Sequence, residues 1–108
     1  MYQIEHRPAA MQDMSEIVQY IAETLYSPDA ANRLRSKFKE AAQSLKELPH
    51  RCPAAQLSKA FKQKSNGEYR KMKIDNYLML YQINETEKIV TITRVIYARM
   101  NYSSNSGN

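Results

Sequence analysis

Several residue types that mark common classes of protein are scarce in this chain of 108 residues. A single cysteine, Cys52, cannot form a disulfide within the chain, and with His6 and His50 as the only histidines there is no ordinary set of zinc ligands. Two glycines are too few for the Gly-rich loops of P-loop and dinucleotide-binding folds. No apolar run approaches the roughly 20 residues of a membrane-spanning helix, and residues 1–17 contain no export signal. We therefore expect a cytoplasmic protein that has no membrane partner, metal or cofactor.

Length and charge describe a small basic domain. We expect one domain over residues 1–102 and a disordered polar tail over residues 103–108. The net charge of +5 arises within residues 50–75, which hold seven Lys/Arg against two acidic residues, whereas the rest of the chain holds nine of each. This local excess favours an acidic or polyanionic partner, and a solvated basic loop is the alternative. The candidate partner-binding cations of this region are Lys59, Lys62, Lys64 and Arg70.

Hydrophobic periodicity predicts a strand and two helices in the first half of the chain. Residues 1–6 alternate apolar and polar side chains, which is typical of a strand, and Pro8 ends the alternation. Apolar residues at three- and four-residue steps predict a helix over residues 9–25. Ser27 as N-cap and Pro28 at the first position predict the start of a second helix, which Pro49 ends. Its predicted apolar seam is Ala31, Leu34, Phe38, Ala41, Leu45 and Leu48.

The second half predicts strands. Residues 49–68 form a long connection, with a short helical turn expected near residues 56–62. Strands are expected over residues 69–74 and 77–83, joined by the tight turn Asp75-Asn76, and over residues 89–97. The order is β-α-α-β-β-β. We therefore predict an α+β fold in which an antiparallel sheet packs against an N-terminal helical hairpin.

Three stretches of this sequence resemble a known superfamily. They are "YQIEHRPAAMQDMSEIVQYI", "YRKMKIDNYLMLYQINE" and "VTITRVIYARMNY", which together extend over nearly the whole chain. The helical hairpin, the "YR" strand, the "NYL..Y" strand and the "RVIY.R" strand are similar to those of the RelE/ParE toxins of bacterial type II toxin–antitoxin systems. The resemblance implies two helices packed on an antiparallel sheet. It also implies a cognate acidic antitoxin that forms a hetero-oligomer with the toxin.

The resemblance leaves two activities open. RelE-like members are mRNA endonucleases that act on the ribosome, and the residues that match their catalytic pattern are Lys71, Lys73 and Arg99, with Tyr97 in the place that some relatives give to a histidine. That pattern also has an arginine where this chain has Leu78, and an apolar side chain cannot stabilise charge on a phosphate. Leu78 favours the ParE-like branch, whose members poison DNA gyrase. The alternatives are the ribosome-dependent endonuclease and a family member that only binds its antitoxin.

Other basic and aromatic residues have a functional and a structural interpretation. Arg70, Arg94 and Arg99 are candidates for binding the target or the antitoxin. Alternatively, Arg70 pairs with a carboxylate on the adjacent strand, and Arg94 is held by hydrogen bonds at the edge of the core, on one face with Val90, Ile92 and Ile96. In a regular strand, Lys71 and Lys73 lie on the face opposite Arg70. The strand tyrosines either stack on bases or cover the sheet; they are Tyr69, Tyr77, Tyr81 and Tyr97.

Overall fold

The computed structural model describes residues 1–55 and 68–98, and its elements follow the predicted order. They are β1 (Gln3–His6), α1 (Pro8–Gln19), the π-helical segment η1 (Tyr20–Thr24), α2 (Pro28–Ser44), the 3₁₀ turn η2 (Pro49–Arg51), β2 (Arg70–Ile74), β3 (Tyr77–Asn84) and β4 (Ile89–Tyr97). The helical turn predicted near residues 56–62 and the tail over residues 103–108 lie outside the described residues. In the part of the chain that is described, no helix combines the length and the apolar character needed to cross a bilayer.

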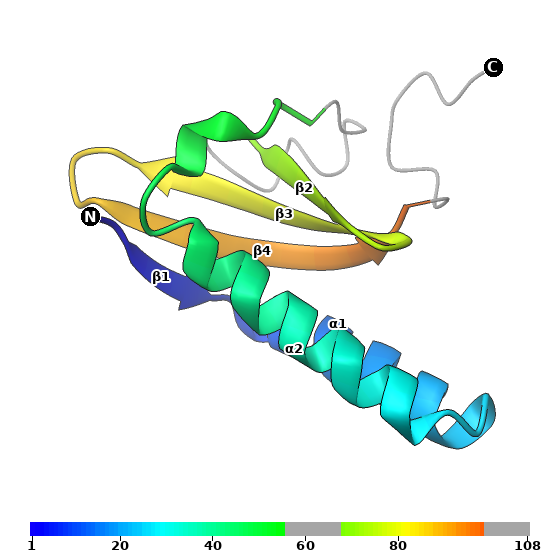
Figure 1. The fold of residues 1–108 in the computed structure, drawn as a ribbon. Coiled ribbons are helices and arrows are strands. Elements are labelled where there is room, and N and C mark those ends of the chain that lie inside the picture. The colour runs from blue at the N-terminus through cyan, green and yellow to red at the C-terminus, as the bar shows by residue number, and fades with distance from the viewer. Residues whose placement is uncertain (56–67, 99–108) are drawn as a thin grey trace, which may run out of the picture.

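The four strands form one sheet in the order β1-β4-β3-β2. β2, β3 and β4 are antiparallel neighbours, and β1 lies parallel to β4 at the other edge. The helices α1 and α2 lie side by side on one face of this sheet (Figure 1). The predicted α+β fold with a helical hairpin is therefore confirmed, and the sheet departs from the predicted antiparallel arrangement at β1 alone among the described strands.

Proline places the start of each helix, and the turn between them has unusual backbone. Pro8 and Pro28 occupy first-turn positions, where the missing N–H has no helical partner to lose. α1 widens into η1, where the N–H of Leu25 donates to the carbonyl of Tyr20 over 3.1 Å, and Tyr26 follows with a positive φ of 54°. Ser27 is the N-cap residue of α2, as predicted, but its side chain makes no capping bond, because its hydroxyl donates to the Leu25 carbonyl at 3.1 Å.

The main core lies between the helices and the sheet. Its buried apolar residues are Ala10, Val18, Ala31, Leu34, Phe38, Ala42, Leu45, Ile74, Met79, Tyr81, Val90, Ile92 and Val95. The predicted seam of the second helix is wrong only at Leu48, which is 66% exposed because α2 ends at Ser44. Ala41 is partly buried and packs against the core, and its neighbour Ala42 is buried as well.

A turn between β2 and β3 and a bulge in β4 decide which side chains lie on the outer face of the sheet, which is the face away from the helices. The Asp75-Asn76 turn is confirmed, with Asp75 at φ 53°. The register of β4 shifts opposite Leu80, where the Thr93 hydroxyl donates to the Leu80 carbonyl at 3.1 Å. Such a bulge reverses the alternation of the residues that follow it. Ile96 therefore packs with Leu78 and Leu80 on the outer face, and the prediction that Ile96 shares a face with Val90 and Ile92 is wrong.

Candidate functional surfaces

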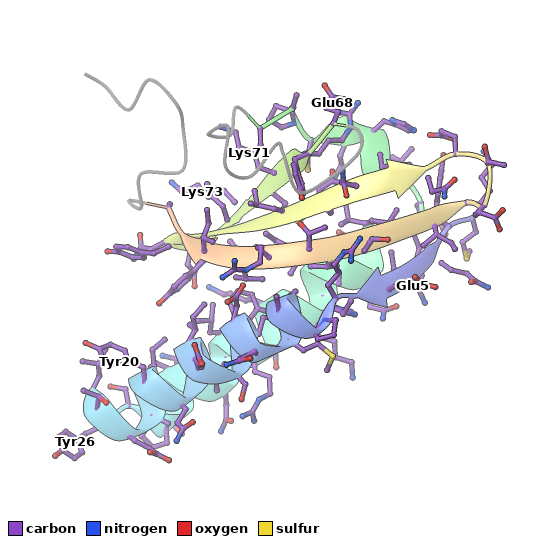
Figure 2. The ribbon with its side chains drawn as sticks, turned by 180° about the vertical axis from the view of Figure 1, so that it is seen from behind. Glu5, Tyr20, Tyr26, Glu68, Lys71 and Lys73 are labelled. Atoms are coloured by element: carbon purple, nitrogen blue, oxygen red, sulfur yellow. The ribbon has the colours of Figure 1, made fainter. Side chains whose placement is uncertain are left out.

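Lys71 and Lys73 lie on the outer face of β2. Their register partners on β3 are Leu80 and Leu78, which belong to the outer apolar cluster, and Figure 2 shows both lysines on the side of the sheet away from the helices. Lys73 is exposed and Lys71 is partly covered. The two alternate positions thus share one face, as predicted, and Arg70 and Met72 lie toward the opposite face.

Leu78 is part of a small apolar cluster on that outer face. It is 6% exposed and packs with Leu80 and Ile96, against which Tyr69 and Ala55 are also packed. Leu78 therefore stabilises the sheet at the position where the RelE-like pattern has an arginine.

Tyr97 lies on the other side of the sheet, among aromatic rings. Its ring is 5.7 Å from that of Tyr77, and the Tyr77 ring is 6.0 Å from Phe38 of α2. Burial, followed by the nearby Tyr97, Tyr20 and Asp75 groups, raises the pKa of Tyr77. The structure does not bring Tyr97 together with Lys71 or Lys73, because the rings face the helices and the lysines face away from them.

Arg70 is engaged by the chain itself. Its guanidinium donates to the carbonyl oxygens of Cys52 at 2.6 Å and His50 at 3.2 Å, and it lies 3.6 Å from the carboxylate of Glu68. The predicted carboxylate partner on the adjacent strand is wrong, since Glu68 precedes Arg70 along the same segment. Arg70 thereby attaches the stretch after α2 to β2, and an isolated bridge between Ala54 and Arg70 continues this contact.

Arg94 is also paired. Its Nε and Nη2 donate to the two carboxylate oxygens of Asp13 on α1, at 2.7 and 3.0 Å, and the N–H of Val95 donates to Asp13 at 2.9 Å. The hydrogen bond from Arg94 to Asp13 is the main cause of a raised Arg94 pKa. This agrees with the structural interpretation of Arg94, which fastens α1 to β4.

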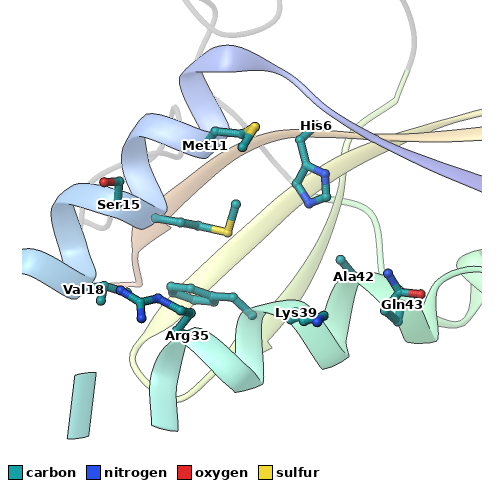
Figure 3. A pocket seen from close by; sticks show the side chains of 10 residues that line it. His6, Met11, Ser15, Val18, Arg35, Lys39, Ala42 and Gln43 are labelled. Carbon is teal, nitrogen blue, oxygen red and sulfur yellow. The ribbon is translucent and has the colours of Figure 1, made fainter. Parts of the chain in front are cut away.

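A groove between the helices was not found by sequence reasoning. Its volume is about 310 Å³, and its apolar floor is formed by Met14, Val18, Phe38 and Ala42. His6, Met11 and Ser15 border it on one side, and Arg35, Lys39 and Gln43 of α2 border it on the other (Figure 3). Desolvation lowers the pKa of His6. The sequence signal that could have indicated the groove is the pair Arg35 and Lys39, which lie four residues apart on one side of α2 beside its buried positions.

Four predicted site residues lie outside the described residues: Lys59, Lys62, Lys64 and Arg99. Within the described residues, no group of three or more His, Cys, Asp or Glu side chains is placed to hold a metal ion.

The comparison with protein families decides which branch of the superfamily is matched. Residues 4–102 match the family model described as "ParE toxin of type II toxin-antitoxin system, parDE". The chain belongs to the ParE toxin family. The resemblance inferred from the sequence is thereby confirmed, and the protein is a toxin of a type II toxin–antitoxin system. A search of curated proteins found no significant match.

Solved structures share the fold of this ParE-family toxin at low sequence identity. The chromosomal ParDE system of P. aeruginosa contains a similar chain at 16% identity and a TM-score of 0.67, covering 90% of this chain and 96% of that one. The RelE–RelB complex of Pyrococcus horikoshii is similar at 13% identity and a TM-score of 0.56, covering 90% and 94%. The intact E. coli RelBE complex is similar at 17% identity and a TM-score of 0.56, covering 93% and 100%. Likeness at such identities shows the fold alone.

Proposed function

We propose that this ParE-family toxin inhibits growth by acting on DNA gyrase and is neutralised by a cognate acidic antitoxin in a hetero-oligomer. We choose gyrase as the target because the structure separates the residues that match the endonuclease pattern. Lys71 and Lys73 lie on the outer face of the sheet, whereas the ring of Tyr97 packs beside Tyr77 on the helix-facing side. Proton transfer during phosphodiester cleavage requires groups within hydrogen-bond reach of one substrate. A tyrosine on the opposite face does not meet that requirement.

The burial of Leu78 supports the same choice. An endonuclease that lacks a metal relies on cations aimed at the charge that develops on the phosphate. Leu78 is 6% exposed within an apolar cluster, so its position contributes packing to the outer face. Lys71 and Lys73, the outer-face cations of β2, then serve solubility or partner docking.

The groove between the helices is where we place the acidic segment of the antitoxin. Arg35 and Lys39 border an apolar floor, and the described residues that line the groove include no carboxylate. An amphipathic helix fits such a groove by burying its apolar face against the floor while its carboxylates meet the two cations. Arg70 and Arg94 are less suited to this role, because each already binds groups of its own chain.

Charge reversal on α2 tests this docking site. Arg35→Glu is expected to weaken antitoxin binding about tenfold or more, because it places like charges opposite each other. Arg33→Glu is the matched control, since Arg33 is exposed on the same helix and does not line the groove. Affinities are measured by calorimetry on purified proteins. Equal weakening by the two variants would place the antitoxin elsewhere.

The second candidate is the ribosome-dependent endonuclease, favoured by the presence of Lys71 and Lys73 on one face of β2. Lys73→Ala separates it from the gyrase proposal. We expect a folded Lys73→Ala protein to stop growth as effectively as the wild type. Loss of toxicity with an unchanged circular dichroism spectrum would instead favour the endonuclease.

A further inference from the structure

Three tyrosines from separate elements meet at the end of the sheet nearest the helical turn. Tyr77 and Tyr97 are register partners on β3 and β4, with ring centroids 5.7 Å apart and ring planes inclined by 60°. Tyr20, at the start of η1, lines the same two hollows as both of them. We call this group the tyrosine cleft. One hollow, of about 430 Å³, lies toward α1 and β4, and the other, of about 700 Å³, lies toward α2 and the β2–β3 turn.

Two of the three rings of the tyrosine cleft are open to solvent, and the ring of Tyr77 is half-buried against the core. Tyr20 is 54% exposed and Tyr97 is 40% exposed, and Leu25 at the border of the larger hollow is 51% exposed. Figure 2 shows Tyr20 at the helical end of the molecule, far from Lys71 and Lys73. The π-helical segment η1 is a rare backbone form, and such segments are frequently found at functional sites. Exposed tyrosines grouped with a leucine are typical of a surface that binds protein.

The described residues that line the tyrosine cleft carry a net charge opposite in sign to that of the chain as a whole. Asp13, Glu16 and Asp75 contribute to the two hollows, and Arg94 is the one Lys or Arg among the described lining residues. Arg94 is neutralised by Asp13, and Asp75 by Lys37 at 2.9 Å. Glu16 accepts a hydrogen bond from the neutral amide of Gln12 and helps Asp13 to raise the pKa of Arg94, so the two carboxylates share one cation and together carry an excess negative charge.

The aromatic rings and the carboxylates of the tyrosine cleft favour a positively charged ligand. The faces of tyrosine rings attract cations, and guanidinium groups are frequent occupants of such sites. The excess negative charge of Asp13 and Glu16 over Arg94 adds attraction for a cation and repels a phosphate. Nucleic acid and an acidic peptide are therefore disfavoured here, in contrast to the groove beside Arg35 and Lys39.

We infer that the tyrosine cleft of Tyr20, Tyr77 and Tyr97 binds an arginine side chain of a partner protein, with apolar neighbours of that arginine resting on Leu25. The site goes beyond the proposed function, since it depends neither on gyrase nor on the antitoxin. It also gives the strand tyrosines Tyr77 and Tyr97 a role other than stacking on bases.

A pair of peptides tests this inference on the full-length free toxin. One blocked peptide has a central arginine flanked by leucines, and its twin has citrulline, which is neutral and nearly the same shape. We expect the arginine peptide to shift the NMR signals of Tyr20, Tyr77 and Tyr97 and to bind roughly fivefold more tightly than its twin. Equal affinity for the two peptides, or shifts centred on another surface, would overturn the inference.

Variants of the rings show whether the tyrosine cleft itself is responsible. Tyr20→Ala and Tyr97→Ala should each weaken binding of the arginine peptide about threefold, whereas Tyr97→Phe keeps the ring and retains the affinity. Tyr26→Ala is the matched control, because Tyr26 is 86% exposed near the same turn and does not line the hollows. Equal loss with Tyr26→Ala would contradict the inference. Circular dichroism verifies that each variant is folded.

Discussion

Replacing Asp13 with alanine should remove the main polar attachment of α1 to the sheet. Its carboxylate accepts bonds from Arg94 Nε at 2.7 Å, from Arg94 Nη2 at 3.0 Å and from the Val95 N–H at 2.9 Å. The Asp13 side chain is 14% exposed and that of Arg94 is 41% exposed, so water can solvate the arginine once its partner is gone, and the ion pair counts for less than a buried one. The Val95 N–H loses its acceptor, which alone costs about 1–3 kcal/mol if it stays dry. We expect Asp13→Ala to lower the free energy of unfolding by about 2–3 kcal/mol.

Urea unfolding followed by circular dichroism measures this loss, which corresponds to a fall in Tm of roughly 10 °C for a domain of this size. Glu16→Ala is the matched control, because it removes an exposed carboxylate from the same helix. It should change stability by less than about 0.5 kcal/mol. A double-mutant cycle with Arg94→Met separates the ion pair from the bond to Val95. A cost below about 0.5 kcal/mol for Asp13→Ala would refute the reasoning.

Three further substitutions have defined expectations. Tyr81 is buried and donates to the Pro49 carbonyl at 2.6 Å, so Tyr81→Phe should cost about 1–2 kcal/mol in thermal unfolding at pH 7. Burial raises the pKa of Tyr81, so as the pH rises the hydroxyl loses its proton in the unfolded chain before it does so in the folded protein. The wild type therefore loses stability above about pH 10, and its stability advantage over Tyr81→Phe shrinks there. A stability difference that stays constant with pH would contradict this. Tyr26→Gly should leave Tm unchanged or raise it by a few degrees, since Tyr26 has φ 54° and is 86% exposed, and a clear fall would show that its ring packs. Arg51→Ala removes donors to the carbonyl of Ser44 at the end of α2 and to that of Leu48 just before η2. It should cost about 1 kcal/mol in urea unfolding, and no change would count against this role.

Local sequence signals predicted the elements well where one physical cause dominates. Pro8 and Pro28 mark the helix starts, and Asp75 accepts the positive φ of the tight turn, so both features were readable from the chain. The parallel pairing of β1 with β4 was not readable, because a strand of four residues carries no mark of its neighbour's direction. The same limit applies to the bulge at Thr93, which depends on a hydrogen bond to another strand.

The candidate surfaces were harder to predict than the fold. Alternation in β2 correctly placed Lys71 and Lys73 on one face, opposite Arg70. The tyrosine cleft depends on Tyr20, whose place follows from the π-helical widening after α1, and periodicity of a regular helix does not predict that widening. The sequence left Arg70 either to bind a partner or to pair with a carboxylate on the adjacent strand, yet it binds carbonyls of a segment that is separated from it by many residues. Contacts between distant segments decide such roles.

The most direct test of the target runs two purified assays in parallel on the free toxin. One measures gyrase supercoiling and cleaved DNA, and the other measures cleavage of mRNA on programmed ribosomes. We expect cleaved DNA to accumulate with gyrase and mRNA to remain intact, since Tyr97 and the lysines Lys71 and Lys73 lie on opposite faces of the sheet. Cleavage of ribosome-bound mRNA with no effect on gyrase would contradict the proposed target, and inactivity in both assays would indicate a family member that only binds its antitoxin.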